Sequence, residues 1–148
     1  EVLIFGDSDD YFSDNRIELS LKHLQNFDIV VNDLNLFNES GVYEEKYISN
    51  RVENNSIVNY SFIKDKNIFG MTNTAINLNI LDRVDFDDSL IAVDWFMFKD
   101  LLKLAHKAIF TNEIISYYRQ HSENTIGLRE AGGRHLLWWE KKSGYGLN

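Results

Sequence analysis

The chain has 148 residues, and its content of 44% hydrophobic and 14% aromatic residues is typical of one globular domain. Cysteine is absent, which excludes disulfides and thiolate metal sites, so a metal ligand would have to be oxygen or imidazole nitrogen. The net charge of -8 argues against a general nucleic-acid-binding surface, because phosphate binding requires clustered Lys and Arg.

The first part of the chain predicts a strand, a helix and a second strand. The segment from Glu1 to Phe5 is rich in apolar residues and reads as a strand. Asp14 is placed to cap a helix that ends near Asn26, and three apolar residues recur at helical spacing along it, namely Ile17, Leu21 and Leu24. An apolar alternation then predicts a strand from Asp28 to Phe37.

The middle of the chain is less regular. We expect residues 41–66 to be mostly loop, with a short strand or helix within them. Gly70 indicates a special backbone position, and Ala75 to Leu81 predicts a further short strand or helix.

The last third predicts one regular helix and two short strands. From Asp94 onward, five apolar residues fall on one helical face, namely Trp95, Phe98, Leu101, Leu102 and Ala105. Ala108 to Phe110 and Glu113 to Tyr118 read as strands, and His135 to Lys142 has the pattern of a helix. Because strands and helices alternate, we predict an α/β fold with a mainly parallel, mixed sheet flanked by helices. We expect a single domain over residues 1–148, in which residues 129–148 are a tail without an assigned place.

No part of the chain has the pattern of a membrane span or a targeting signal. A run of about 18 apolar residues is lacking, as are the charged and apolar regions of a signal peptide, so we expect a soluble, cytoplasmic protein. The run from Leu136 to Trp139, followed by Lys141 and Lys142, fits peripheral contact with the inner face of a membrane. It fits packing in the core or against a partner as well.

Three carboxylates directly follow the first predicted strand, namely Asp7, Asp9 and Asp10. A helix-loop-helix calcium site fits poorly, because Tyr11 and Phe12 stand where an oxygen ligand and a glycine are needed. Two interpretations remain open. The segment is either a solvated acidic turn, or a site at the carboxyl end of a strand where Mn²⁺ or Mg²⁺ bridges a phosphorylated ligand.

Two further segments carry candidate chemistry. Asp94 stands at the start of the most regular helix, as a first-turn acid facing the helix dipole or as a catalytic base. Arg119 and His121 follow a predicted strand. They are either surface residues, or a guanidinium that binds phosphate oxygens and an imidazole that ligates a metal.

Three segments in this order resemble the inverting nucleotide-sugar glycosyltransferases of the family-two type, which have the A-type glycosyltransferase (Rossmann-like) fold. "LIFGDSDDYF" is similar to their strand and Asp-x-Asp region, "IAVDWFMFKDLL" to their Glu-Asp-Trp helix start, and "ISYYRQHSENTIG" to their "YRQH…N…G" segment. The similarity covers about Val2 to Leu128. Val93 stands where the family usually has Glu before the base.

The resemblance implies a donor site built around a divalent cation, Mn²⁺ or Mg²⁺. Asp7 and Asp9 match the Asp-x-Asp pair, and Asp10 lies beside them, so these residues are expected to hold the cation and the donor diphosphate. Arg119 and His121 match the segment near the diphosphate, with His121 as a metal ligand.

The resemblance also implies a catalytic base and a sugar-binding stretch. Asp94 matches the base that deprotonates the acceptor hydroxyl. The stretch "FGMTNTA", which includes Gly70 and Asn73, falls where the family contacts donor sugar and acceptor. The implied activity is transfer of a sugar from a nucleotide-sugar donor, such as a UDP-sugar, to a saccharide or other hydroxyl acceptor with inversion, in synthesis of a surface polysaccharide or glycoconjugate.

The family's N-terminal nucleotide-binding half has no counterpart in this sequence. We therefore expect a C-terminal portion that binds nucleotide poorly alone and has an exposed sheet edge open to self-association. Two other hypotheses are a non-catalytic interaction or scaffold domain with a solvated acidic loop, and a phosphatase fragment of the haloacid dehalogenase type. The latter is suggested by Gly6 and Asp7 with Asp10, but a matching nucleophile segment is absent from the sequence.

Overall fold

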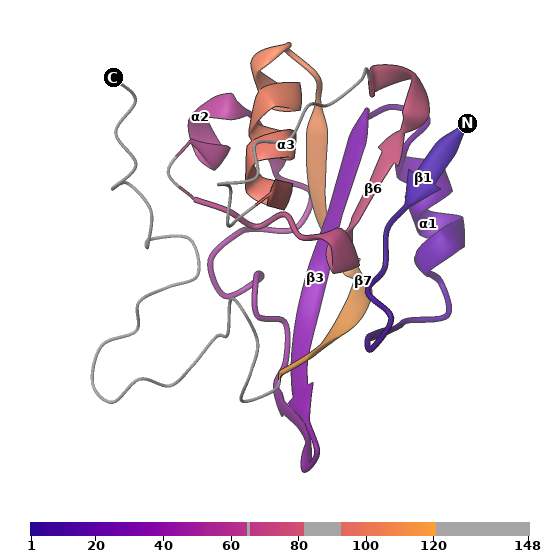
Figure 1. Ribbon diagram of the computed structural model, residues 1–148, viewed down its shortest axis with the longest axis vertical. Coiled ribbons are helices and arrows are strands. Elements are labelled where there is room, and N and C mark those ends of the chain that lie inside the picture. Colours follow the sequence, from indigo (N-terminus) through magenta and orange to yellow (C-terminus); the bar gives the residue numbers. More distant parts are fainter. Residues whose placement is uncertain (65, 82–92, 121–148) are drawn as a thin grey trace.

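The computed structural model describes residues 1–64, 66–81 and 93–120 (Figure 1). Within them the chain forms a mixed sheet with helices on both sides, so the α/β class predicted from the sequence is confirmed. The predicted helix from His135 to Lys142 and the tail 129–148 lie outside the described residues. The elements in chain order are β1 (Val2–Ile4), β2 (Tyr11–Phe12), α1 (Arg16–His23), β3 (Ile29–Asn38), β4 (Gly41–Glu44), β5 (Ile57–Val58), α2 (Tyr60–Ile63), a 3-10 turn (Met71–Asn73), β6 (Thr74–Asn77), a second 3-10 turn (Leu78–Ile80), α3 (Val93–Lys103) and β7 (Ala108–Arg119).

The sheet is mixed, and the prediction that it is mainly parallel was wrong. Its strand order is β1-β6-β3-β7-β2, with β4 added to β3 and β5 added to β7. The long central pair β3 and β7 is parallel, whereas the other five pairings of the described strands are antiparallel. Alternation of helices and strands in the sequence does not determine the direction of each strand, because a short strand such as β6 can pair antiparallel with a long one.

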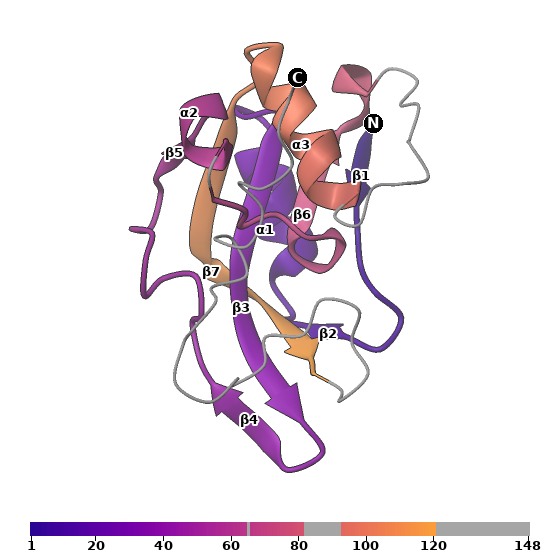
Figure 2. The same ribbon diagram turned by 60° about the vertical axis from the view of Figure 1, so that its left-hand side comes forward.

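Two apolar clusters lie on opposite faces of this sheet. One cluster packs β3 and β7 against the inner face of α3, including Phe98, Leu101 and Leu102. The other joins Leu24 at the end of α1 to Val30 and further residues of β3, β6 and β7. In Figure 2, α3 lies in front of the sheet and α1 behind it. The predicted helix from Asp94 is thus confirmed as α3. Of its predicted apolar face, Phe98, Leu101 and Leu102 are buried, Trp95 is half-buried and Ala105 is exposed, while Met97 is buried as well.

Strand β3 is buried on both faces along nearly its whole length. Every residue from Ile29 to Phe37 is buried, including three polar ones, Asn32, Asp33 and Asn35. The carboxylate of Asp33 is satisfied by the backbone N–H groups of Leu34 and Ile48, each at 2.8 Å. The period-two alternation in the sequence therefore predicted the strand correctly but does not separate an inner from an outer face.

The two short strands predicted after Ala108 form one strand, β7, with a bulge. Its pairing with β3 jumps from Thr111 to Ile115, so the residues between them bulge out of the ladder. The side chain of Asn15 donates a hydrogen bond to the Glu113 carbonyl in this bulge, at 2.9 Å. Helix α1 is thereby tied to β7, and Asn15 rather than Asp14 is the residue that precedes the helix.

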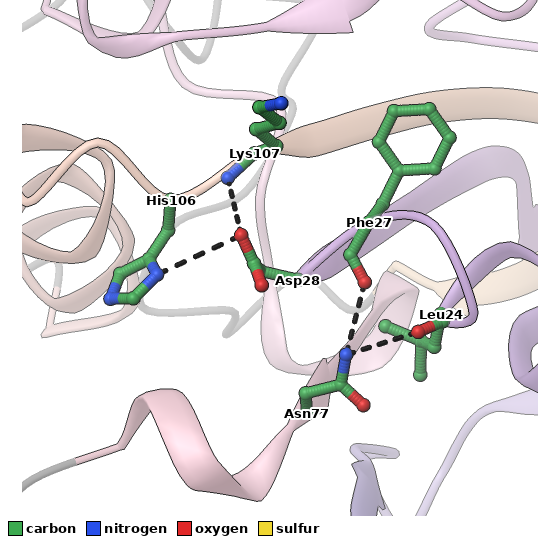
Figure 3. Close-up of polar contacts among 6 residues, drawn as sticks. All are labelled: Leu24, Phe27, Asp28, Asn77, His106 and Lys107. Carbon is green, nitrogen blue, oxygen red and sulfur yellow. Dashed lines mark hydrogen bonds and ion pairs between the residues drawn. The ribbon is translucent and has the colours of Figure 1, made fainter.

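Polar contacts join the starts of β3 and β7 to the neighbouring ends of α1 and β6 (Figure 3). The Asp28 carboxylate accepts a hydrogen bond from the Lys107 backbone N–H at 2.8 Å and lies 3.7 Å from His106 Nδ1. The Asn77 amide donates to the carbonyls of Leu24 and Phe27, at 3.1 and 3.0 Å. These contacts fix the end of α1, the start of β3 and the end of β6 relative to one another.

The region from residue 41 to residue 66 contains more regular structure than the sequence indicates. It includes β4, β5 and the short helix α2, joined by turns. The Asn59 side chain caps α2 by accepting a hydrogen bond from Phe62 N. The expected short strand or helix from Ala75 to Leu81 is confirmed in both forms, since β6 leads into a 3-10 turn.

Candidate functional site

The three carboxylates predicted as metal ligands lie on one loop between β1 and β2. We call residues Gly6 to Asp10 the acidic loop. Asp10 N donates a hydrogen bond to Asp7 O at 3.3 Å, which closes the loop as a turn. Asp7 and Asp9 are exposed, whereas Asp10 is half-buried. The loop thus presents its carboxylates at the carboxyl end of β1, as the sequence predicted.

Asp10 is the most constrained of the three acids. Its Oδ1 accepts a hydrogen bond from Arg119 N at 2.8 Å, while Oδ2 is buried and has no hydrogen-bond partner among the residues that the structure describes. Burial raises the pKa of Asp10, and the charges of Asp9 and Asp7 add to the rise. The Arg119 N–H and the nearby Thr72 hydroxyl oppose it, although Thr72 and Asp10 do not meet the geometry of a hydrogen bond. A buried carboxylate oxygen that lacks a partner has unused capacity to bind a cation.

Arg119, at the end of β7, is joined to the same loop. Its backbone contact to Asp10 is extended by its side chain, in which Nε donates to the Asp9 carbonyl at 3.1 Å. The guanidinium also lies over the Phe37 ring, 4.6 Å from its centroid. The predicted association of Arg119 with the acidic loop is therefore present in the fold, and it places a positive charge beside the carboxylates.

Asp94 lies in the first turn of α3, and its carboxylate interacts with the charge of Asp7. Its Oδ1 accepts a hydrogen bond from Trp95 N at 2.7 Å, and the Trp95 indole in turn donates to the Ile63 carbonyl at 2.8 Å. These bonds fix the start of the helix against α2. Burial raises the pKa of Asp94, the neighbouring N–H groups oppose the rise, and Asp7 adds to it.

Tyr118 was not selected from the sequence, yet it lies close enough to three of the candidate acids for their charges to affect its pKa. Burial raises the pKa of Tyr118 to about 12, and the charges of Asp10, Asp7 and Asp94 contribute to that rise. The phenol is thus a neutral hydrogen-bonding group among carboxylates that come from separate segments. The sequence feature that could have identified Tyr118 as a site residue is its position directly before Arg119 in "YYRQH". The alternation along β7 shows only which face of the sheet Tyr118 occupies.

Gly70 precedes and Asn73 ends the 3-10 turn that carries Thr72, whose hydroxyl lies near Asp10. Asn73 is fully buried, and its side chain is used by the backbone: Oδ1 accepts from Gly70 N at 2.8 Å, and Nδ2 donates to the carbonyls of Asn32 and Ile68 at 2.9 and 3.0 Å. Gly70 has ordinary extended angles, with φ -140° and ψ 164°. The special backbone conformation expected at Gly70 is therefore not found, and Asn73 acts on the site by holding this loop against β3.

Replacement of Asn73 tests this role. We expect Asn73→Ala to lower the free energy of unfolding by about 3 kcal/mol, because it leaves buried backbone groups of Gly70, Asn32 and Ile68 unpaired. Urea denaturation followed by circular dichroism measures this loss. Asn79→Ala, at an exposed position, is the matched control and should change stability by less than about 0.5 kcal/mol. Equal stabilities of the two variants would contradict the role given to Asn73.

The carboxylates of the acidic loop fit a divalent cation whose other ligands come from a phosphorylated substrate and water. Within residues 1–64, 66–81 and 93–120, no group of three or more His, Asp and Glu side chains is arranged to hold a metal by itself. Mg²⁺ and similar ions commonly bind one or two carboxylates together with phosphate oxygens and water, however. The all-oxygen donor set of the acidic loop and the unpartnered Asp10 Oδ2 suit that mode. His121, the other predicted ligand, lies outside the described residues.

The pKa direction of Asp94 leads to a prediction on stability. Because burial raises its pKa in the folded chain, the ionised carboxylate destabilises the fold at neutral pH, and this cost disappears as pH falls through the raised value. We expect Asp94→Asn to melt at a higher temperature than the parent at pH 7 in EDTA. The difference should shrink as pH falls and the parent residue gains its proton as well. Calorimetry measures both melting temperatures. A melting temperature of Asp94→Asn that lies below that of the parent by the same amount at every pH would contradict this prediction.

Comparison of the chain with protein-family models, with curated proteins and with solved structures found no match. Among the described residues, no helix has the length and apolar character needed to cross a membrane.

Proposed function

We propose that this chain is the metal- and acceptor-binding part of an inverting, metal-dependent glycosyltransferase with a partial A-type glycosyltransferase fold. The observation that carries the proposal is the packing of α3 beside the acidic loop: Phe5, directly before the loop, contacts Phe98, one turn after Asp94, with ring centroids 6.2 Å apart. The charge of Asp7 adds to the rise in the pKa of Asp94, in agreement with this packing. A base and a diphosphate-binding loop must lie close together in such an enzyme, because the acceptor attacks the carbon that the diphosphate leaves. The resemblance of the three motif segments supports the same function.

In this proposal Asp7, Asp9 and Asp10 hold Mn²⁺ or Mg²⁺ together with the diphosphate of a nucleotide-sugar donor, such as a UDP-sugar. The cation, when bound, neutralises negative charge on the leaving diphosphate. The acidic loop cannot bind that anion directly, since its carboxylates repel phosphate. Arg119 supplies a positive charge at the edge of the loop, and we assign His121 as a further ligand on the basis of the resemblance alone.

Asp94 is proposed to act as the general base. A carboxylate oxygen of Asp94 takes the proton of the acceptor hydroxyl as the acceptor oxygen bonds to the anomeric carbon. The bond from that carbon to the diphosphate oxygen breaks on the opposite side, so the configuration inverts and the nucleoside diphosphate leaves with the bonding electrons. The desolvation that raises the pKa of Asp94 makes it a stronger base than an exposed carboxylate.

A transfer assay with the complete gene product tests the proposal. UDP-sugars are supplied one at a time with Mn²⁺ and a mixture of saccharide acceptors, and released UDP is measured. We expect release that depends on both acceptor and Mn²⁺ and that EDTA abolishes. If UDP-, GDP-, CDP- and dTDP-sugars give no turnover with Mn²⁺, and Mn²⁺ with the corresponding nucleoside diphosphates does not raise the melting temperature, the proposal is wrong and the scaffold hypothesis is favoured.

A further inference from the structure

Helix α1 turns a charged residue inward and leaves apolar residues outside. Arg16 is only 4% exposed, whereas Ile17 is 64% and Leu21 43% exposed. Of the three apolar residues that recur at helical spacing in this segment, only Leu24 is buried, while Ile17 and Leu21 face solvent. Burial of Arg16 is unfavourable for its charge and lowers its pKa to about 10. Such an arrangement requires compensating contacts, because desolvation of an ion is costly.

Those contacts are to the two sides of the acidic loop. Arg16 Nη2 donates a hydrogen bond to the carbonyl of Phe5, directly before the loop. The guanidinium carbon lies 3.8 Å from the centroid of the Phe12 ring, shortly after it. Gly6 also packs on that ring, since a Cβ at this position would lie 2.8 Å from Phe12. Arg16 therefore contacts the segments through which the chain enters and leaves the loop.

Arg16 also supplies a positive charge beneath the carboxylates. Its charge interacts with that of Asp10. Within the described part of the chain, Arg16 Nε and Asp10 Oδ2 are both buried without a hydrogen-bond partner, so these two atoms do not form an ion pair with each other. Like charges on Asp7, Asp9 and Asp10 would otherwise drive the loop apart when no cation is present.

We propose that Arg16 is a positioning residue, which holds the acidic loop in a cation-binding shape through the Phe5 carbonyl and the Phe12 ring. This inference rests on the proposed function in taking a divalent cation as the ligand of the loop. The guanidinium geometry is essential to it, because only a planar group can bond to the carbonyl and lie over the ring at the same time.

Substitution of Arg16 tests the inference in the complete gene product. We expect Arg16→Met to raise the Mn²⁺ Kd, measured by electron paramagnetic resonance in the presence of UDP, by roughly 10- to 100-fold, the usual effect of losing a residue that orients a ligand. Arg16→Lys keeps the charge but not the plane, so it should recover only part of the affinity. Lys22→Met removes an exposed positive charge from the same helix and should leave Kd within about twofold. An unchanged Kd in folded Arg16→Met would overturn the proposal.

A double-variant cycle shows whether Arg16 acts through the loop. In an Asp10→Asn background, Arg16→Met should weaken Mn²⁺ binding less than it does alone, because residues that act on one site are not additive. Full additivity would overturn the inference.

Amide hydrogen exchange separates this inference from the proposed function. If the parent protein binds no Mn²⁺ in the presence of UDP, the proposed function fails. The role of Arg16 in holding the loop is then tested by amide exchange within the loop. Asp10 N–H, bonded to Asp7 O, should exchange faster in Arg16→Met but not in Lys22→Met. Equal exchange at Asp10 in Arg16→Met and the parent would show that Arg16 does not hold the loop.

Discussion

Asp94→Asn is expected to lower the rate of sugar transfer by about 10²- to 10⁴-fold, the range that a general base contributes. The substitution keeps an oxygen that can accept the hydrogen bond from Trp95 N, so α3 should start at the same place. It removes the carboxylate that takes the proton and the repulsion from Asp7. Steady-state release of UDP by the complete gene product gives kcat and KM, and the loss should fall on kcat.

The control for this variant is Asp100→Asn on the same helix. Asp100 pairs with Lys103 at 3.1 Å on the surface, so its loss should change activity by less than about twofold. Mn²⁺ binding should persist in Asp94→Asn, because Asp94 is not proposed as a ligand. If this variant retains parental kcat, Asp94 is not the base, whatever the acidic loop binds.

Asp10→Asn is expected to raise the Mn²⁺ Kd in the presence of UDP by about 100-fold or more, above the range for residues that only orient a ligand. Asparagine can still accept the hydrogen bond from Arg119 N through its oxygen, so the loop stays attached to β7. It replaces the unpartnered Oδ2 with an amide nitrogen, which cannot bind a cation. Isothermal titration with Mn²⁺ and UDP measures the effect.

Asp14→Asn serves as the comparison, because Asp14 is an exposed acid just beyond the loop. It removes one negative charge, as Asp10→Asn does, and should leave Mn²⁺ binding nearly unchanged. Equal losses in the two variants would mean that overall negative charge, rather than a site at Asp10, attracts the ion. That result would favour the interpretation of the segment as a solvated acidic turn.

Local patterns predicted most elements, because strands and helices depend largely on residues near in sequence. The strand before Asp7, the long strand from Asp28, the helix from Asp94 and the strand that ends near Arg119 are all present. The position of the acidic residues at the end of β1 followed from the same patterns. Direction and continuity of strands did not, since the antiparallel β6 and the bulge in β7 depend on partners distant in sequence.

The orientation of α1 shows most clearly what local patterns cannot decide. Apolar spacing favours Ile17 and Leu21 toward the core, and a short helix can rotate when one strong set of contacts outweighs that preference. Here the Phe5 carbonyl and the Phe12 ring accept the Arg16 guanidinium, so Arg16 is buried instead. Neither partner is distinguishable from other backbone carbonyls and aromatic residues in the sequence.

The residue types of the candidate site can be read from the sequence: the carboxylates after β1, the acid at the start of α3 and the arginine at the end of β7. Their proximity in space follows from the packing of the fold. Asp94 comes near Asp7 because α3 packs on the sheet face beside the end of β1, and Arg119 reaches Asp9 and Asp10 because β7 pairs with β2. Spacing along the chain contains neither fact, since electrostatic interaction depends on distance in space and on burial, which arise only from packing.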